Sequence, residues 1–273
     1  YFIKLKSGFK SWNEYYVNQR LKNPNFEADF SDANLNKSNF KHYLFYKSNF
    51  NRSNLQNCNF QLTDCRYSYF IDAKLSGSNL VQANLNSTKL NRVDLSGANL
   101  SYANLESAYL IDSILFKTNF SHAYLRNSTL TNAYLYLAIL SYSNLYHSNL
   151  SHSDLTDANL SNSILSQAQL RECYINSADL SYSNCFNTNF IRSELSSTNL
   201  ICANFSKANL SQVDLRNSNL TNTNFNGANL ENADLSGAII SNTNFIESNL
   251  NSTKIDKKYQ LIITDYKGQP NWK

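Results

Sequence analysis

Four histidines and five cysteines are the residues of this chain best suited to metal binding or to nucleophilic and acid–base chemistry. They are His42, His122, His147 and His152, and Cys58, Cys65, Cys173, Cys185 and Cys202. No two cysteines form a CxxC pair, and their odd number argues against both a disulfide framework and a zinc site. The cysteine usage therefore favours a reducing compartment.

The carboxylates are also scattered along the chain. Asp154 and Asp157 form a near pair on an outer face without a base between them, and such a pair is typical of a solvated surface. The sequence contains no GxGxxG, Walker A, GxSxG or HExxH motif, the local signatures of nucleotide, acyl-transfer and zinc-hydrolase sites. We therefore predict no catalytic residue, no cofactor and no metal, and a protein that is not an enzyme.

The elements that position these side chains follow from a period of five residues. Residues 81–105 read VQANLNSTKLNRVDLSGANLSYANL, with leucine at every fifth position. From Phe30 to Ile255 all 46 central positions of the repeat are apolar, namely 30 Leu, 11 Phe, 3 Ile and 2 Cys. The residue two places earlier is small or short-branched in every repeat except at Tyr43. This regularity predicts that both positions face the inside of one structure.

Neither an α-helix nor a flat strand accommodates this period. A step of five residues turns about 140° around a helix and alternates between the two faces of a strand. A chain that turns a corner after every repeat instead keeps all central residues inside. Phe30, Phe50 and Phe70 lie 20 residues apart, which indicates four repeats to a coil because wide rings fit best above one another. We therefore predict an all-β solenoid with a square cross-section.

The pentamers SDANL, SGANL, SYANL, VQANL and NGANL resemble the A(D/N)LXX motif of the pentapeptide-repeat proteins. The resemblance covers residues 28–255. It implies a right-handed quadrilateral parallel β-helix with short helical caps. The flank from Gly8 to Leu35 resembles the capped N-terminus common among cyanobacterial members, and the tail that begins at Thr253 resembles their C-terminal cap.

Three segments are predicted: an N-terminal cap at residues 1–25, the β-solenoid at residues 26–255, and a C-terminal cap at residues 256–273 with a short helix and a tail. A solenoid needs such caps because each of its ends exposes a strand edge and an apolar interior.

The cap helices are predicted from local signals. Ser11 to Glu14 has capping-box spacing, which predicts a helix over about residues 12–22. Its apolar face is expected to comprise Trp12, Tyr16 and Leu21. Near the other end, Asp256 is expected to cap a short helix from 257 to about 264, although the letters QLIIT would also suit a strand.

Aromatic and aliphatic side chains stand out on a surface that is otherwise Asn, Ser, Thr and Gln. One corner of successive coils is predicted to carry Tyr102, His122, Tyr142 and Tyr182, in a stripe with His42, Leu62 and Cys202. A neighbouring face is predicted to carry Ile114, Phe116, Tyr134, Tyr136, Leu137 and Tyr174. Apolar patches on a polar surface mark protein contacts, and tyrosine is favoured there. Aromatic residues that only support the sheet are the alternative.

The charge distribution separates the function classes. Residues 25–255 hold 15 basic and 17 acidic residues, a net charge of −2, so the rod offers no phosphate-binding stripe and nucleic acid is not expected as a partner. We predict a rigid scaffold or regulator that binds a partner protein of unknown identity. The alternatives are a DNA mimic that protects or inhibits a type II topoisomerase, as the resemblance implies for some members, and a structural subunit of a larger assembly.

No membrane span is expected, because no stretch approaches the roughly 18–20 apolar residues that a span needs. Residues 1–25 also lack the apolar region of a signal peptide. We expect a cytoplasmic protein, with a thylakoid-associated or plastid location as the alternative that the resemblance suggests. A homodimer formed through a terminal cap stays open.

Overall fold

Each pentapeptide folds into a short extended segment followed by a tight corner. The central residue and the residue two places before it point inward, and the next two residues make the corner. The second corner residue has a positive φ in every repeat from Asp32 (58°) to Ser252 (57°), a conformation that Asn, Asp and Gly adopt with least strain. A backbone hydrogen bond closes the corner, as from Ala138 N–H to the Leu135 carbonyl (2.9 Å).

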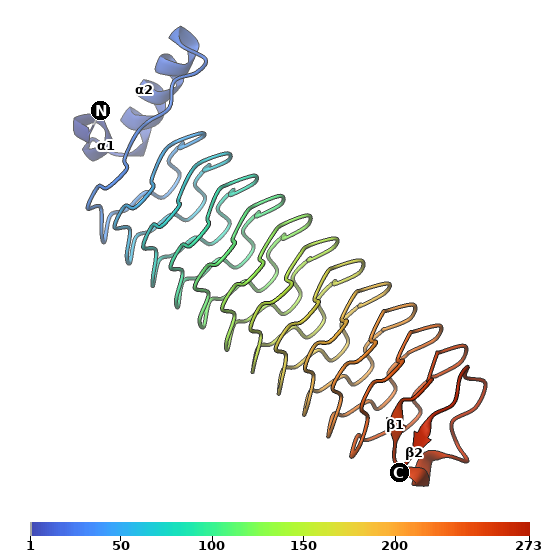
Figure 1. The fold of residues 1–273 in the computed structure, drawn as a ribbon. Coiled ribbons are helices and arrows are strands. Elements are labelled where there is room, and N and C mark those ends of the chain that lie inside the picture. The colour runs from blue at the N-terminus through green and yellow to red at the C-terminus, as the bar shows by residue number, and fades with distance from the viewer. Residues whose placement is uncertain (1) are drawn as a thin grey trace.

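The coils stack in parallel with a register of 20 residues. Isolated parallel bridges run from Asp29–Asn49 to Asp234–Lys254. In the computed structural model, which describes residues 2–273, the coils form one elongated rod with both α-helices at its N-terminal end (Figure 1). The predicted right-handed quadrilateral β-helix, with four repeats to each coil, is confirmed.

The interior of the rod is a continuous apolar column. From Phe40 to Ile255 every central residue is at most 5 % exposed. The predicted ring stacks are present, since the Phe50 ring centroid lies 4.9 Å from those of both Phe30 and Phe70. Inward hydroxyls are mostly bonded to carbonyls, as Ser143 is to Leu140 (2.6 Å), which removes the penalty of burying them. Because side chains fill the interior, the outer surface is the part of the rod that can bind.

Two helices, α1 (Phe2–Lys6) and α2 (Phe9–Lys22), close the N-terminal end of the rod. Trp12 of α2 has no exposed surface, and its Nε1 donates to the Leu44 carbonyl at 2.7 Å. Its ring centroid lies 5.6 Å from those of Phe30 and Phe45. Aromatic side chains of α2 therefore seal the open end of the apolar column.

Tyr43, the one large residue at its inward position, is explained by this cap. Its ring is 5 % exposed, and its hydroxyl donates to the Leu5 carbonyl in α1 at 3.0 Å. The exception in the repeat is thus a specific contact between the first coils and the cap.

The N-terminal helix differs from the prediction in two ways. It begins at Phe9, follows Gly8 and has no side-chain cap, so Ser11 lies inside the helix and does not cap it. Leu21 is 77 % exposed and lies off the face buried by Trp12 and Tyr16. Nine residues separate Trp12 from Leu21, which places them about 180° apart around the helix axis. No helix within residues 2–273 is long and apolar enough to cross a membrane.

The C-terminal end also differs from the prediction. Its elements are β1 (Lys254–Ile255), the 3₁₀-helix η1 (Lys257–Tyr259) and β2 (Asn271–Trp272). The predicted helix is therefore a single short turn without a side-chain cap from Asp256, and residues 260–264 form neither helix nor strand. The tail instead returns across the last coil, and β2 pairs in parallel with β1. This pairing covers the strand edge at that end.

Candidate protein-interaction surface

Three rings are stacked along one corner of the rod. The ring centroid of His122 lies 4.7 Å from that of Tyr102 and 4.9 Å from that of Tyr142, with interplanar angles of 1° and 7°. Each of the three is the second corner residue of its repeat, and successive members of the stack lie one coil apart along the rod. Tyr182 belongs to the same corner but not to the stack, because Asn162 lies between it and Tyr142. Both tyrosines at the ends of the stack are more than half exposed.

A second group of exposed apolar residues lies on another side of the same coils. Tyr134 bridges to Ile114 one coil earlier, and the Tyr136 ring stacks on Phe116 with centroids 5.8 Å apart and an interplanar angle of 16°. Tyr134 is 60 % exposed and Ile114 is 45 % exposed. Leu137 follows Tyr136 at the corner. The structure therefore brings five of the predicted surface residues together within two coils, with Tyr174 two coils beyond Tyr134.

Ile139 joins the two groups, and sequence reasoning missed it. It occupies the outer face between the two corners and is 40 % exposed. The available signal was that Asn usually holds this position of the repeat, as Asn119 and Asn159 do one coil away on either side. Two adjacent faces of a single coil, and the corner after each, thus carry outward apolar side chains, with the polar Ser141 among them. We call these apolar residues the aromatic belt; it comprises Tyr134, Tyr136, Leu137, Ile139 and Tyr142.

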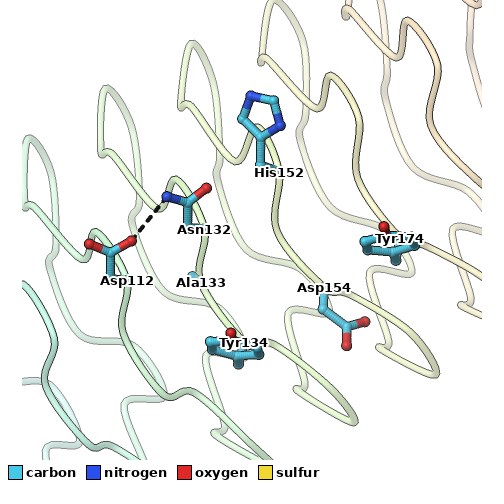
Figure 2. Close-up of a pocket in the computed structure, with 7 residues that line it drawn as sticks. All are labelled: Asp112, Asn132, Ala133, Tyr134, His152, Asp154 and Tyr174. Carbon is cyan, nitrogen blue, oxygen red and sulfur yellow. Dashed lines mark hydrogen bonds between the residues drawn. The ribbon is translucent and has the colours of Figure 1, made fainter.

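A shallow depression of about 470 Å³ adjoins one end of the belt. Figure 2 shows its lining, in which the Asp154 carboxylate lies between the Tyr134 and Tyr174 rings along the rod. These three residues occupy the same position in three successive coils, with bridges from Tyr134 to Asp154 and from Asp154 to Tyr174. We call this arrangement the tyrosine slot. It is formed by Tyr134, Asp154 and Tyr174.

The charges around the slot are unevenly paired. Glu172 contacts Arg171 (2.9 Å), His152 (3.4 Å) and Arg192 (3.7 Å), and the hydrogen bond from Arg171 is the main cause of its lowered pKa. Asp154 has no ion pair within residues 2–273, and one of its carboxylate oxygens accepts the Thr156 N–H at 3.0 Å. The Asp154 carboxylate therefore gives the slot a negative charge that no cation within residues 2–273 offsets.

The histidines do not assemble a chemical site. His122 lies within the ring stack, and His152 is held by Glu172. Across the described residues, 2–273, no group of three or more His, Cys, Asp or Glu is arranged to hold a metal ion.

Four of the five thiols are buried inside the rod, as their positions in the repeat predict. Burial raises the pKa of Cys58 to about 11, and it raises the pKa of Cys65, Cys173 and Cys185 to about 12. These thiols stay protonated near neutral pH, and a protonated thiol is a poor nucleophile.

We expect a thiol reagent at pH 8 to modify one cysteine in the folded chain, Cys202, and all five after unfolding. Cys202 lies on an outer corner and is partly exposed, whereas the other thiols are neither accessible nor ionised. Reaction of an aromatic disulfide reagent, followed by absorbance in buffer and in guanidinium chloride, measures this. The Cys202→Ser variant is the control, and rapid reaction of that variant when folded would contradict the expectation.

The geometry defines the class of protein first: a right-handed quadrilateral β-helix built from five-residue repeats. The family model for pentapeptide repeats matches residues 26–61, 63–101, 78–115, 118–157, 153–184, 178–217 and 214–251, and the chain belongs to this family. Proteins of this family are generally non-catalytic. No curated protein matches the chain.

Solved structures similar to this chain come from several sources. HetL, a pentapeptide-repeat protein from Nostoc sp. strain PCC 7120, is 26% identical with a TM-score of 0.59, covering 86% of this chain and 94% of its own. It is described as involved in the regulation of heterocyst differentiation. Rfr23 from Cyanothece 51142 is 33% identical over 37% of this chain and 63% of its own, with a TM-score of 0.20. A form of QnrB1, a plasmid-mediated fluoroquinolone resistance protein, is 18% identical over 72% of this chain and 91% of its own, with a TM-score of 0.47.

Proposed function

We propose that this protein is a rigid, non-catalytic scaffold or regulator that binds a partner protein through the aromatic belt. The observation that carries the proposal is the density of apolar residues in the belt: five of the six outward residues from 134 to 142 are apolar, and Ser141 is the polar one. At the positions of Tyr134, Tyr136, Leu137 and Ile139 most other coils have Asn, Ser or a charged residue; the equivalents three coils later are Glu194, Ser196, Ser197 and Asn199.

The fold does not need apolar residues on the belt. The coil is held by its buried central residues and by backbone bonds to the coils on either side, and polar residues satisfy the same backbone elsewhere. A contiguous apolar patch on a polar surface is typical of a protein-binding site, and tyrosines often supply much of the binding energy at such sites. The rigid coil also lowers the entropy lost on binding.

The similarity to HetL supports a regulatory role. HetL is described as part of the regulation of a differentiation process, and it matches this chain over most of both lengths. We extend the regulatory role to this chain as part of the proposal and place it in a reducing compartment such as the cytoplasm, because all five thiols are unpaired.

Charge argues against DNA mimicry by this rod. Its 46 repeats, at four to a coil and about 4.8 Å between coils, give a length of about 55 Å. A DNA duplex of that length carries about 30 negative charges, whereas residues 25–255 carry a net charge of −2. Several surface carboxylates are also paired with arginine, as Asp72 is with Arg92 (2.7 Å).

The belt is tested with the triple variant Tyr134→Asn, Tyr136→Ser and Leu137→Asn, which installs the polar residue types that other coils carry. We expect it to keep the fold and to recover the partner at about one tenth of the wild-type level or less, the effect of losing a hot spot. The measurement is quantitative mass spectrometry after affinity capture from the native cell extract. The protein identified in this way is then purified and titrated against both chains.

The matched control changes the same three positions four coils earlier, as Asn54→Ser, Gln56→Ser and Asn57→Ser. It changes the equivalent three positions outside the belt, so we expect wild-type recovery. Equal capture of the same proteins by wild type and by the belt variant would overturn the proposal.

A further inference from the structure

We propose that the tyrosine slot receives a cationic side chain, arginine or lysine, of the partner protein. This inference rests on the proposed function and adds to it the chemistry of one contact. The slot adjoins the belt because Tyr134 belongs to both, so a partner seated on the belt also reaches the slot.

Asp154 and Asp94 are the two aspartates in this column of the rod that form no ion pair among the described residues, and only Asp154 stands between two tyrosines, because Lys74 and Ile114 flank Asp94. Asp214 is bound by Arg216 (2.6 Å) and Asp234 by Lys254 (3.1 Å), while Glu194 accepts from the Asn176 amide (3.1 Å). In the Asp154 coil the residue equivalent to Arg216 is Thr156, which donates only its backbone N–H. Within residues 2–273 no cation lies at ion-pair distance from Asp154. Its charge is therefore available to an external cation.

The two tyrosine rings suit the same ligand. The face of a tyrosine ring attracts cations, and this protein uses that attraction elsewhere, with Lys89 Nζ 3.2 Å from the Tyr109 ring centroid. No cation among residues 2–273 lies over Tyr134 or Tyr174. The two residues stand two coils apart, about 10 Å, and the shorter Asp154 side chain lies between them, so an incoming cation would lie above the carboxylate with a tyrosine on either side.

The charge of the lining selects a cation over an anion. Asp112 adds a second carboxylate at the edge of the depression, where it accepts from the Asn132 amide at 3.0 Å. The nearby guanidinium groups of Arg171 and Arg192, and the His152 imidazole, contact Glu172. A phosphate or carboxylate ligand would face Asp154 directly, so charge complementarity favours a guanidinium or ammonium group.

The test uses a blocked tripeptide, acetyl-Gly-Arg-Gly-amide, and its Lys and Gln counterparts as probes. Each is titrated at low salt into the full chain labelled at its tyrosine rings, and ring resonances are followed by NMR. We expect saturable shifts of the Tyr134 and Tyr174 rings with the Arg or Lys peptide, and none with the Gln peptide.

The Asp154→Asn variant is expected to bind the cationic peptide about fivefold more weakly than the wild type. This is the factor expected for the loss of one exposed charge contact. Asparagine keeps the bond to the Thr156 N–H, so the fold is retained. Asp157→Asn, on the corner of the same coil, is the matched control because it removes the same charge outside the slot; we expect wild-type affinity.

Equal affinity of wild type and Asp154→Asn for the cationic peptide would overturn the proposal that the slot binds a cation. Equal shifts of all exposed tyrosines, or equal shifts with the Gln peptide, would overturn it too. These peptide titrations need no partner protein. A negative result therefore leaves the belt to be judged by its own capture experiment, and the two failures can be told apart.

Discussion

Replacing Leu135 by aspartate is expected to unfold the central coils of the rod. Leu135 is fully buried, and its backbone bonds to the next coil through Asp154 O (2.7 Å). Truncation of a buried leucine alone costs about 2–5 kcal/mol. A carboxylate without a partner in the apolar column adds a further penalty, so we expect a loss above about 5 kcal/mol in the free energy of unfolding, measured by guanidinium denaturation.

Leu137→Asp is the control for this prediction. It makes the same substitution two residues away, at an outer corner where the chain already places Asp32, Asp72 and Asp157 with positive φ. We expect its unfolding free energy to stay within about 0.5 kcal/mol of the wild type, as for most surface changes. Similar losses in both variants would contradict the assignment of inner and outer positions.

Trp12→Ala is expected to open the N-terminal end of the rod. The indole is fully buried against Phe30 and Phe45 and donates to the Leu44 carbonyl. Loss of such a ring costs about 3–5 kcal/mol. Because repeats contact only their neighbours, the loss should be local, with faster amide hydrogen exchange in the first coils, residues 28–50, and unchanged exchange in residues 205–245.

Two further variants, a milder substitution and a control, are compared with Trp12→Ala. Trp12→Phe keeps most of the packing and removes the indole N–H, so we expect a smaller effect, on the order of 1–3 kcal/mol for the carbonyl left without its donor. Leu21→Ala, on the exposed side of α2, should leave exchange unchanged. Equal acceleration at both ends of the rod would argue against a local cap.

The surface patches were only partly readable from the sequence. The positions of Tyr102, His122 and Tyr142 on one corner follow from the period of 20 residues. Their continuity with Tyr134 and Tyr136 through Ile139 required the closed coil, because residues on different sides of a square are neighbours only once the corners are placed. Only the placed side chains, likewise, show that no cation among residues 2–273 reaches Asp154 between its two tyrosines.

The sequence alone determined the fold of the rod, because the same local rule is repeated 46 times and each inward residue supports the next coil. It also determined which cysteines are buried, since their place in the repeat decides this. Only the tertiary structure decided the caps: the start of α2 at Phe9, the exposure of Leu21 and the return of β2 to β1. The sequence of the caps does not follow the five-residue repeat. Their structure depends on single contacts between residues far apart in the chain, such as the contact of Trp12 with Leu44.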